Sequence, residues 1–234
     1  MAEVKVCLVT GAASLIGQHI VAELVAAKHK VIALGDPTDT FIPDVLTKRQ
    51  IKINTALPIT TASFKKYNVQ FCFGDVSDIS FLASIFSGLA QNDIAIEYVF
   101  HLSANKAIQK SSPAAYHPEF IASANVLEVV KAYWQGHKET FKGFFYAAEN
   151  NAKSGKVETM LNKMNEKDNF PAVIFKDENQ PLGAGYKGRT SLASLYRVLT
   201  PFAVSNKWES ADTEDNYINR ITRAVNRFLE TPEK

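Results

Sequence analysis

Two glycines flank a short turn near the start of the chain. Residues 10–17 read Thr-Gly-Ala-Ala-Ser-Leu-Ile-Gly, between an apolar run at residues 4–9 and a segment of helical periodicity. Gly11 permits a tight turn, Gly17 permits close packing of the following helix, and the first backbone N–H groups of that helix can bind phosphate oxygens. The pattern predicts a pyrophosphate site. A strand-to-helix turn without a ligand is the alternative.

An acidic residue follows the second apolar run. Asp36 lies 19 residues beyond Gly17, directly after the run that ends at Gly35, and no arginine is near it in the sequence. A carboxylate at this place accepts hydrogen bonds from an adenosine ribose and repels a 2′-phosphate. We therefore expect NAD as the cofactor, with NADP as the alternative. Asp36 could instead be an ordinary turn residue, because Asp is common in turns and Pro37 follows it.

Strands and helices must position these residues, and the chain alternates between the two. Short apolar runs predict strands at residues 4–9, 31–34, 69–73, 98–103, 144–148 and 172–175. Segments with apolar residues at helical spacing lie at residues 16–25, 79–90, 113–135 (with an interruption at Pro118) and 157–165. Residues 37–68 are polar and weakly periodic, and they predict a long connection with one helix.

This order of elements predicts an α/β fold. Continuously apolar strands that alternate with helices are typical of a parallel sheet covered on both faces, and right-handed crossovers favour the doubly wound Rossmann arrangement. We expect residues 1–182 to form this dinucleotide-binding domain and residues 183–234 to form a small C-terminal lobe packed on it. A last helix should present the apolar face of Ile218, Ile221, Val225 and Leu229.

The composition excludes several classes of protein. The 234 residues carry 26 Lys and Arg against 24 Asp and Glu, without a basic run, so neither nucleic acid nor a membrane is an expected partner. Two cysteines, Cys7 and Cys72, exclude a disulfide framework and a structural zinc site. Residues 1–10 lead directly into a strand and do not read as a secretory leader, so we expect a cytoplasmic protein.

Further short motifs occur in order along the chain. Residues 74–78 read Gly-Asp-Val-Ser-Asp, residues 99–104 read Val-Phe-His-Leu-Ser-Ala, residues 125–127 read Asn-Val-Leu, and residues 171–176 read Pro-Ala-Val-Ile-Phe-Lys. Together with residues 6–17, they resemble the short-chain dehydrogenase/reductase superfamily over most of residues 4–180. The resemblance is to compact, atypical members of its NAD-dependent epimerase/dehydratase branch.

The resemblance implies a set of residues around a dinucleotide. It places the pyrophosphate on the turn, the adenine on residues 75 and 76, and the nicotinamide side along the end of the fourth strand. The predicted cofactor-binding residues are Gly11, Ala13, Ser14, Leu15, Ile16, Gly17, Asp36, Asp75, Val76, Leu102, Ser103, Ala104, Asn125 and Lys156. Two positions depart from the family pattern: Gly35 stands where the ribose-binding acid is usual, and Ser14 replaces the middle glycine of the turn.

The family's catalytic residues are only partly present. Members use a serine or threonine after the fifth strand and a Tyr-x-x-x-Lys pair on the next helix, in which the tyrosine transfers the proton and the lysine lowers its pKa and holds the nicotinamide ribose. Lys156 matches the lysine, but Ala152 stands at the tyrosine position, and no hydroxyl stands at the serine position. Carbonyl reduction needs a positioned proton donor, for which Glu149, Asn150 and Tyr146 are the substitutes. Alternatively, Glu149 is a solvated loop acid and Lys156 a surface lysine.

Two functions follow from this pattern and stay open. In the first, the chain is weakly catalytic or a regulator, whose bound dinucleotide stabilises or switches an interaction surface. In the second, it is an active oxidoreductase or epimerase that acts on a small carbonyl or sugar substrate through a substitute acid. A structural homologue with an empty crevice is disfavoured, because Gly11, Gly17, Asp36 and Asp75 occur together and in order. His101 is expected to complete a strand end.

The resemblance also bears on assembly. In the family, the helices that correspond to residues 113–135 and 157–165 build a two-fold dimer. Apolar side chains in the first of these segments favour a homodimer here, with coverage of the sheet as the alternative. They are Val126, Leu127, Val129, Val130 and Trp134.

Overall fold

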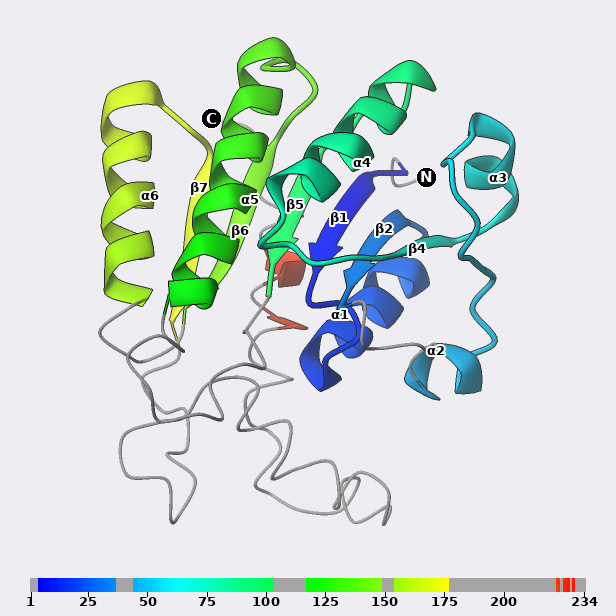
Figure 1. The fold of residues 1–234 in the computed structure, drawn as a ribbon. Coiled ribbons are helices and arrows are strands. Elements are labelled where there is room, and N and C mark those ends of the chain that lie inside the picture. Colours follow the sequence, from blue (N-terminus) through cyan, green and yellow to red (C-terminus); the bar gives the residue numbers. More distant parts are fainter. Residues whose placement is uncertain are drawn as a thin grey trace, which may run out of the picture.

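A computed structural model describes residues 4–36, 44–102, 117–148 and 154–176, together with residues 222, 223, 225–227 and 229. This part of the chain is an α/β fold around a seven-stranded parallel sheet in the order β3-β4-β2-β1-β5-β6-β7 (Figure 1). The strands are β1 (Val6–Thr10), β2 (Lys30–Gly35), β3 (Ile53–Asn54), β4 (Val69–Phe73), β5 (Tyr98–His101), β6 (Gly143–Ala148) and β7 (Ala172–Lys176). The helices are α1 (Leu15–Ala26), α2 (Asp44–Lys48), α3 (Thr61–Lys66), α4 (Ile79–Gln91), α5 (His117–Gly136) and α6 (Ser154–Asp168).

Strand β1 lies at the centre of the sheet, between β2 and β5. The side chains in its middle are buried, as expected for a parallel strand covered on both faces. Its last residue, Thr10, pairs in register with Leu34 of β2 and His101 of β5. The carboxyl ends of these three strands are therefore level. The strand order reverses at β1, so this edge of the sheet is the one at which doubly wound proteins bind ligands. The predicted fold class is confirmed.

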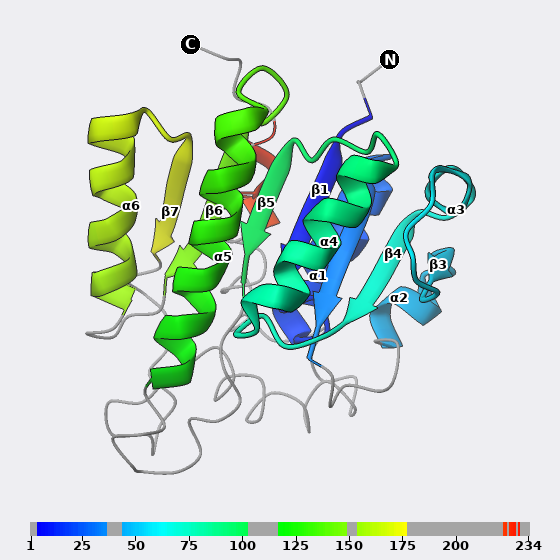
Figure 2. The same cartoon turned by 45° about the horizontal axis from the view of Figure 1, so that its top comes forward.

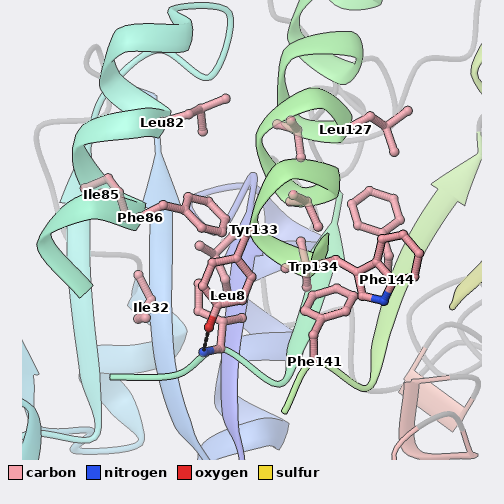
Figure 3. Packing of buried hydrophobic residues seen from close by; sticks show 14 of the residues in the cluster. Leu8, Ile32, Leu82, Ile85, Phe86, Leu127, Tyr133, Trp134, Phe141 and Phe144 are labelled. Carbon is pink, nitrogen blue, oxygen red and sulfur yellow. Dashed lines mark hydrogen bonds between the residues drawn. The ribbon is translucent and has the colours of Figure 1, made fainter. Parts of the chain in front are cut away.

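Helices cover both faces of the sheet. Helices α4, α5 and α6 lie on one face, and α1 and α2 lie on the other (Figures 1 and 2). Val225 and Leu229, from the helical residues near the C-terminus, are buried in the core cluster on the α1 side. Beneath α4 and α5, aromatic and aliphatic side chains fill the second cluster, and the Tyr133 hydroxyl accepts a hydrogen bond from the Ile96 N–H at 2.8 Å (Figure 3).

The six strands predicted from the sequence are all present, to within two residues at either end. The prediction for residues 37–68 was wrong, because the described part of this connection contains two helices, α2 and α3, and the short strand β3. These elements are too short to show a period. Helix α3 instead begins at a capping box, in which Thr60 and Ser63 each accept a hydrogen bond from the other's backbone N–H.

Two predictions about the second half of the chain have different outcomes. Helix α5 is continuous through Pro118, which stands in its first turn, where proline is tolerated because its missing N–H has no acceptor in the helix. The C-terminal lobe stays a prediction, since residues 183–221, with Ile218 and Ile221, lie outside the described residues.

Within the described residues, no helix combines the length and the apolar character needed to cross a bilayer.

Candidate functional site

The turn between β1 and α1 is built so tightly that both of its glycines are needed. Gly11 has a φ of 68°, in the left-handed region that glycine adopts without strain. A Cβ on Gly17 would lie 2.0 Å from the Gly11 carbonyl oxygen, so only glycine lets α1 approach the turn this closely. The Ser14 N–H donates to Gly11 O at 3.0 Å, and the Ala12 N–H donates to Leu34 O at the end of β2 at 3.0 Å. The turn is thus fixed to the sheet.

Ser14 caps the helix whose N-terminus faces the predicted pyrophosphate. Its Oγ accepts a hydrogen bond from the Gly17 N–H at 3.0 Å, and its carbonyl accepts from Gln18 N–H at 2.9 Å. Helix geometry leaves the N–H groups of Leu15 and Ile16 without an acceptor inside α1. The Ser14 hydroxyl therefore stabilises the helix end, and two backbone N–H groups are left as donors for an anion. A pyrophosphate fits this donor set.

The end of β2 shows why the acidic residue comes one position late. A Cβ on Gly35 would lie 2.6 Å from Phe71 Cε1 and 3.5 Å from Ala13 Cβ, so the Phe71 ring occupies the space of a side chain at the family's acid position. Asp36 follows directly after β2 and is half-buried. The backbone of Asp36 lies close to the β1–α1 turn, because the Ala12 N–H of this turn donates to the Leu34 carbonyl near the end of β2.

The loop between β4 and α4 contains the predicted adenine-binding residues. The Asp75 carboxylate accepts a hydrogen bond from the Ser77 N–H at 2.8 Å, which shapes the loop, and Asp75 itself is exposed. Val76 packs against the second core cluster. Asn125 of α5 donates from Nδ2 to the Ser77 carbonyl oxygen at 2.6 Å. The structure thus gives Asn125 a partner in this loop, at the same edge of the sheet as the turn.

A buried polar network joins the ends of β1 and β5 to α5. Thr10 Oγ1 lies 2.7 Å from His101 Nδ1, His101 Nε2 lies 3.0 Å from Ser123 Oγ, and the Leu102 N–H donates to Thr10 Oγ1 at 3.3 Å. Thr10 and His101 are fully buried, and burial lowers the pKa of His101 to about 4. The imidazole is therefore neutral near pH 7. Its position agrees with the expected role in completing a strand end.

Sequence reasoning did not identify Thr10 and Ser123 as parts of this network. The sequence did contain a signal for Ser123. It lies three residues before Val126 and seven before Val130, so this polar residue shares one face of a helix with two apolar ones. A hydroxyl on such a face needs a buried partner. Nothing in the local sequence indicates that the partner is His101, which lies 22 residues earlier.

The predicted catalytic residues fall in very different surroundings. Tyr146 lies near the end of β6, is 6% exposed, and stacks on the His101 ring at 5.6 Å between centroids. Lys156 lies in the first turn of α6 and is exposed. Glu149 and Ala152 lie outside the described residues, as do Ser103 and Ala104, while Leu102 is buried after β5. The order of elements brings Tyr146 and Lys156 to the same edge as the turn.

A cleft of about 580 Å³ lies at the opposite, amino-terminal edge of the sheet. Residues just before β5 and β6, Glu97 and Lys142, line it together with Phe64 and Lys65 of α3. It contains none of the residues predicted to bind cofactor.

Among the described residues, no group of three or more His, Cys, Asp or Glu side chains is placed to hold a metal ion.

Solved structures share this fold at low sequence identity. A UDP-glucose 4-epimerase from Thermotoga maritima, solved with UDP-glucose, matches with a TM-score of 0.53 and 20% identity over 81% of this chain and 61% of its own. A short-chain dehydrogenase/reductase from Saccharomyces cerevisiae matches with a TM-score of 0.51 and 14% identity over 85% and 83%. A Thermus thermophilus UDP-glucose 4-epimerase, solved in complex with NAD, matches with a TM-score of 0.51 and 16% identity over 72% and 53%. The chain therefore spans about three fifths or less of the length of these two epimerases.

The sequence itself matches a family model. No curated protein is similar enough in sequence to count as a relative. The model of the NAD dependent epimerase/dehydratase family matches residues 7–147, more than half of the chain, and this range contains the turn, Asp36 and the loop after β4. The chain belongs to the NAD-dependent epimerase/dehydratase family.

Proposed function

We propose that the chain binds a nicotinamide dinucleotide at the β1–α1 turn and is weakly catalytic or acts as a cofactor-dependent regulator. The observation that carries the binding is the contact between Gly17 and the Gly11 carbonyl, which no other residue type would permit. It brings the Leu15 and Ile16 N–H groups to the carboxyl edge of the sheet, where a pyrophosphate would accept hydrogen bonds from them. Ala13 stands within the same turn.

NAD is the preferred cofactor in this proposal. Asp36 supports this preference, because a carboxylate at the end of β2 would accept hydrogen bonds from the adenosine 2′- and 3′-hydroxyls and would repel a 2′-phosphate. Asp75 and Val76 would contact the adenine, and Leu102, Ser103 and Ala104 would line the nicotinamide side. Lys156 would hold the nicotinamide ribose. The cofactor would supply hydride transfer, and the residues of the chain would hold and orient it.

Weak catalysis follows from the residues that stand near the expected reaction centre. Ala152 cannot move a proton, and no hydroxyl stands at the family's serine position. Tyr146 is packed in the core against His101 rather than exposed at the edge of the sheet. A missing proton donor removes a factor of roughly 10²–10⁴ from the rate of carbonyl reduction.

Isothermal titration calorimetry with NAD⁺, NADH and NADP⁺ tests the proposal. We expect saturable binding of NAD⁺ and NADH and at least tenfold weaker binding of NADP⁺. Absence of binding of all three at millimolar concentration would refute the proposal. Replacement of Asp36 by Ala should reduce the preference for NAD⁺ over NADP⁺, because the repelling carboxylate is then removed.

The alternative is an active oxidoreductase or epimerase that acts on a small carbonyl or sugar substrate, with Glu149 or Tyr146 as the proton donor. It predicts that Glu149→Gln or Tyr146→Phe abolishes turnover while the affinity for NAD⁺ persists. Steady-state assays with a panel of aldehydes, ketones and nucleotide sugars separate the two functions. Turnover in the unmodified protein that one of the two variants abolishes would establish the alternative.

A homodimer through α5 and α6 is a further proposal that rests on the family resemblance. Of the five apolar residues named for it, Val126, Leu127, Val130 and Trp134 are buried in the second core cluster within one protomer, and Val129 is half-buried against the same cluster. A dimer would use the outward faces of α5 and α6. Multi-angle light scattering should then give twice the mass of one chain, and a monomer mass would exclude the dimer.

A further inference from the structure

Helix α5 is connected to two separate parts of the carboxyl edge of the sheet. Ser123 and Asn125 are two residues apart, so their side chains leave the helix roughly 200° apart. Ser123 Oγ lies 3.0 Å from His101 Nε2, and Asn125 Nδ2 donates to Ser77 O at 2.6 Å. One helix therefore contacts both the end of β5 and the loop that follows β4.

The Ser123 contact leads to the phosphate-binding turn. His101 Nδ1 lies 2.7 Å from Thr10 Oγ1, and Thr10 immediately precedes Gly11. Thr10, His101 and Ser123 are all at most 3% exposed, so water does not compete for these hydrogen bonds. The position of α5 is thereby fixed relative to the start of the turn.

The helix is also a firm support. Val126, Leu127 and Val130 are each 1% exposed and pack in the second core cluster, and α5 lies beside α4 on the same face of the sheet (Figures 1 and 2). A hydrogen bond from α5 to the loop therefore connects the loop to the core. The loop is also restrained from within, since the Asp75 carboxylate accepts a hydrogen bond from the Ser77 N–H.

We propose that Asn125 is a positioning residue for the adenine half of the cofactor. It holds Ser77, and through Ser77 it sets where Asp75 and Val76 stand relative to the phosphate-binding turn. The inference rests on the proposed function. The inference adds to the proposed function that Asn125 acts indirectly, through the loop, and not by contact with the cofactor. It also limits this role to the adenine half of the dinucleotide.

The chain offers a matched control for this role. Asn165 of α6 makes the same kind of contact, since its Nδ2 donates to Ala172 O at 3.0 Å and its Oδ1 accepts from the Ala172 N–H at 3.1 Å. These bonds connect α6 to the start of β7, at the opposite edge of the sheet from the turn. Asn165→Ala therefore removes a helix-to-backbone contact of the same chemistry at a distance from the proposed site.

The experiment measures dissociation constants of NAD⁺, 5′-AMP and nicotinamide mononucleotide for the unmodified protein, Asn125→Ala and Asn165→Ala. We expect Asn125→Ala to weaken NAD⁺ and 5′-AMP about five- to tenfold, the effect of one lost hydrogen bond, and to leave nicotinamide mononucleotide unchanged. Asn165→Ala should leave all three constants unchanged. Asn125→Asp, which keeps the shape but removes the donor to Ser77 O, should reproduce the effect if the alanine variant folds poorly.

The outcomes separate this inference from the proposed function. Unchanged affinities in Asn125→Ala and Asn125→Asp would overturn the inference and leave the proposed function standing. An equal loss of affinity for 5′-AMP and for nicotinamide mononucleotide would also overturn the inference. Such a result would indicate a general loosening of the structure, which affects both halves of the cofactor site alike. If the unmodified protein binds no dinucleotide, the proposed function fails, and the inference fails with it.

Discussion

The two halves of the carboxyl edge of the sheet differ in how they are built. Around β1, β2 and β4, the turn, the strand end and the loop are connected by backbone hydrogen bonds, by Ser14 and by Asn125. After β6, the family resemblance implies a tyrosine at the position where this chain has Ala152. In the proposed function, the first half binds the phosphates of the cofactor, and the second lacks a proton donor at the family's tyrosine position.

The difference has a physical reason. Phosphate binding at a helix N-terminus depends on backbone N–H groups and on the absence of side chains at two glycines. We therefore expect phosphate binding to tolerate Ser14 in place of a glycine. Proton transfer depends on single side chains of suitable pKa, and one replacement by alanine removes it. We therefore expect replacements in this family to affect catalysis more readily than phosphate binding.

The largest effect is expected from Gly17→Ala. The new Cβ would lie 2.0 Å from Gly11 O and 2.8 Å from Ala12 Cα, so α1 or the turn must move. We expect a loss of about 3 kcal/mol or more in the free energy of unfolding, together with loss of NAD⁺ binding. Urea unfolding and calorimetry measure the two effects.

Gly88→Ala is the control for this variant. Gly88 also lies within a helix, α4, and a Cβ there would meet no atom within 4 Å. This substitution should raise the free energy of unfolding by about 0.5–1 kcal/mol and leave binding unchanged. Similar losses in the two variants would contradict the role given to Gly17.

The next effect concerns His101 and pH. Burial lowers its pKa from 6.5 to about 4, so the unfolded chain binds more protons between these values. The stability contributed by the neutral imidazole is fully present above pH 6.5 and is lost as the pH falls toward 4. We expect a loss of about 2–3 kcal/mol between pH 7 and pH 4.5 that is absent from His101→Gln.

Urea unfolding of both proteins at several pH values checks this prediction. Burial also lowers the pKa values of His19 and His29, so part of the pH dependence should persist in the variant. The difference between the two curves isolates His101. Parallel curves for His101→Gln and the unmodified protein would show that His101 does not stay neutral in the fold.

The smallest effect is expected from Ser14. Ser14→Ala removes the acceptor of the Gly17 N–H and should cost about 1 kcal/mol in the free energy of unfolding, whereas Ser14→Gly should cost only a few tenths. Both variants should bind NAD⁺ within a few-fold of the unmodified protein, because the donors are backbone groups. Thermal unfolding and calorimetry test this. A large loss of affinity for NAD⁺ in both variants would instead show that the Ser14 hydroxyl contacts the cofactor directly.

The predictability of these features depends on how local they are. The spacing of Gly11 and Gly17 and the alternation of strands and helices are local patterns, and they predicted the turn and the fold class. The Phe71 ring beneath Gly35 and the contact of Thr10 with His101, 91 residues apart, arise only when distant strands pair. The role of Ser14 as a cap could have been recognised, since serine before a helix is a common start signal.

We propose that the Leu15 and Ile16 N–H groups bind the pyrophosphate of the cofactor. Titration of ¹⁵N-labelled protein with NAD⁺, followed by amide chemical shifts, tests it most directly. We expect saturable shifts at Ala13, Leu15 and Ile16 and none at Ala95 or Lys142, which line the cleft at the opposite edge. Shifts confined to that cleft, or unchanged amides at Leu15 and Ile16 at saturating NAD⁺, would contradict the account.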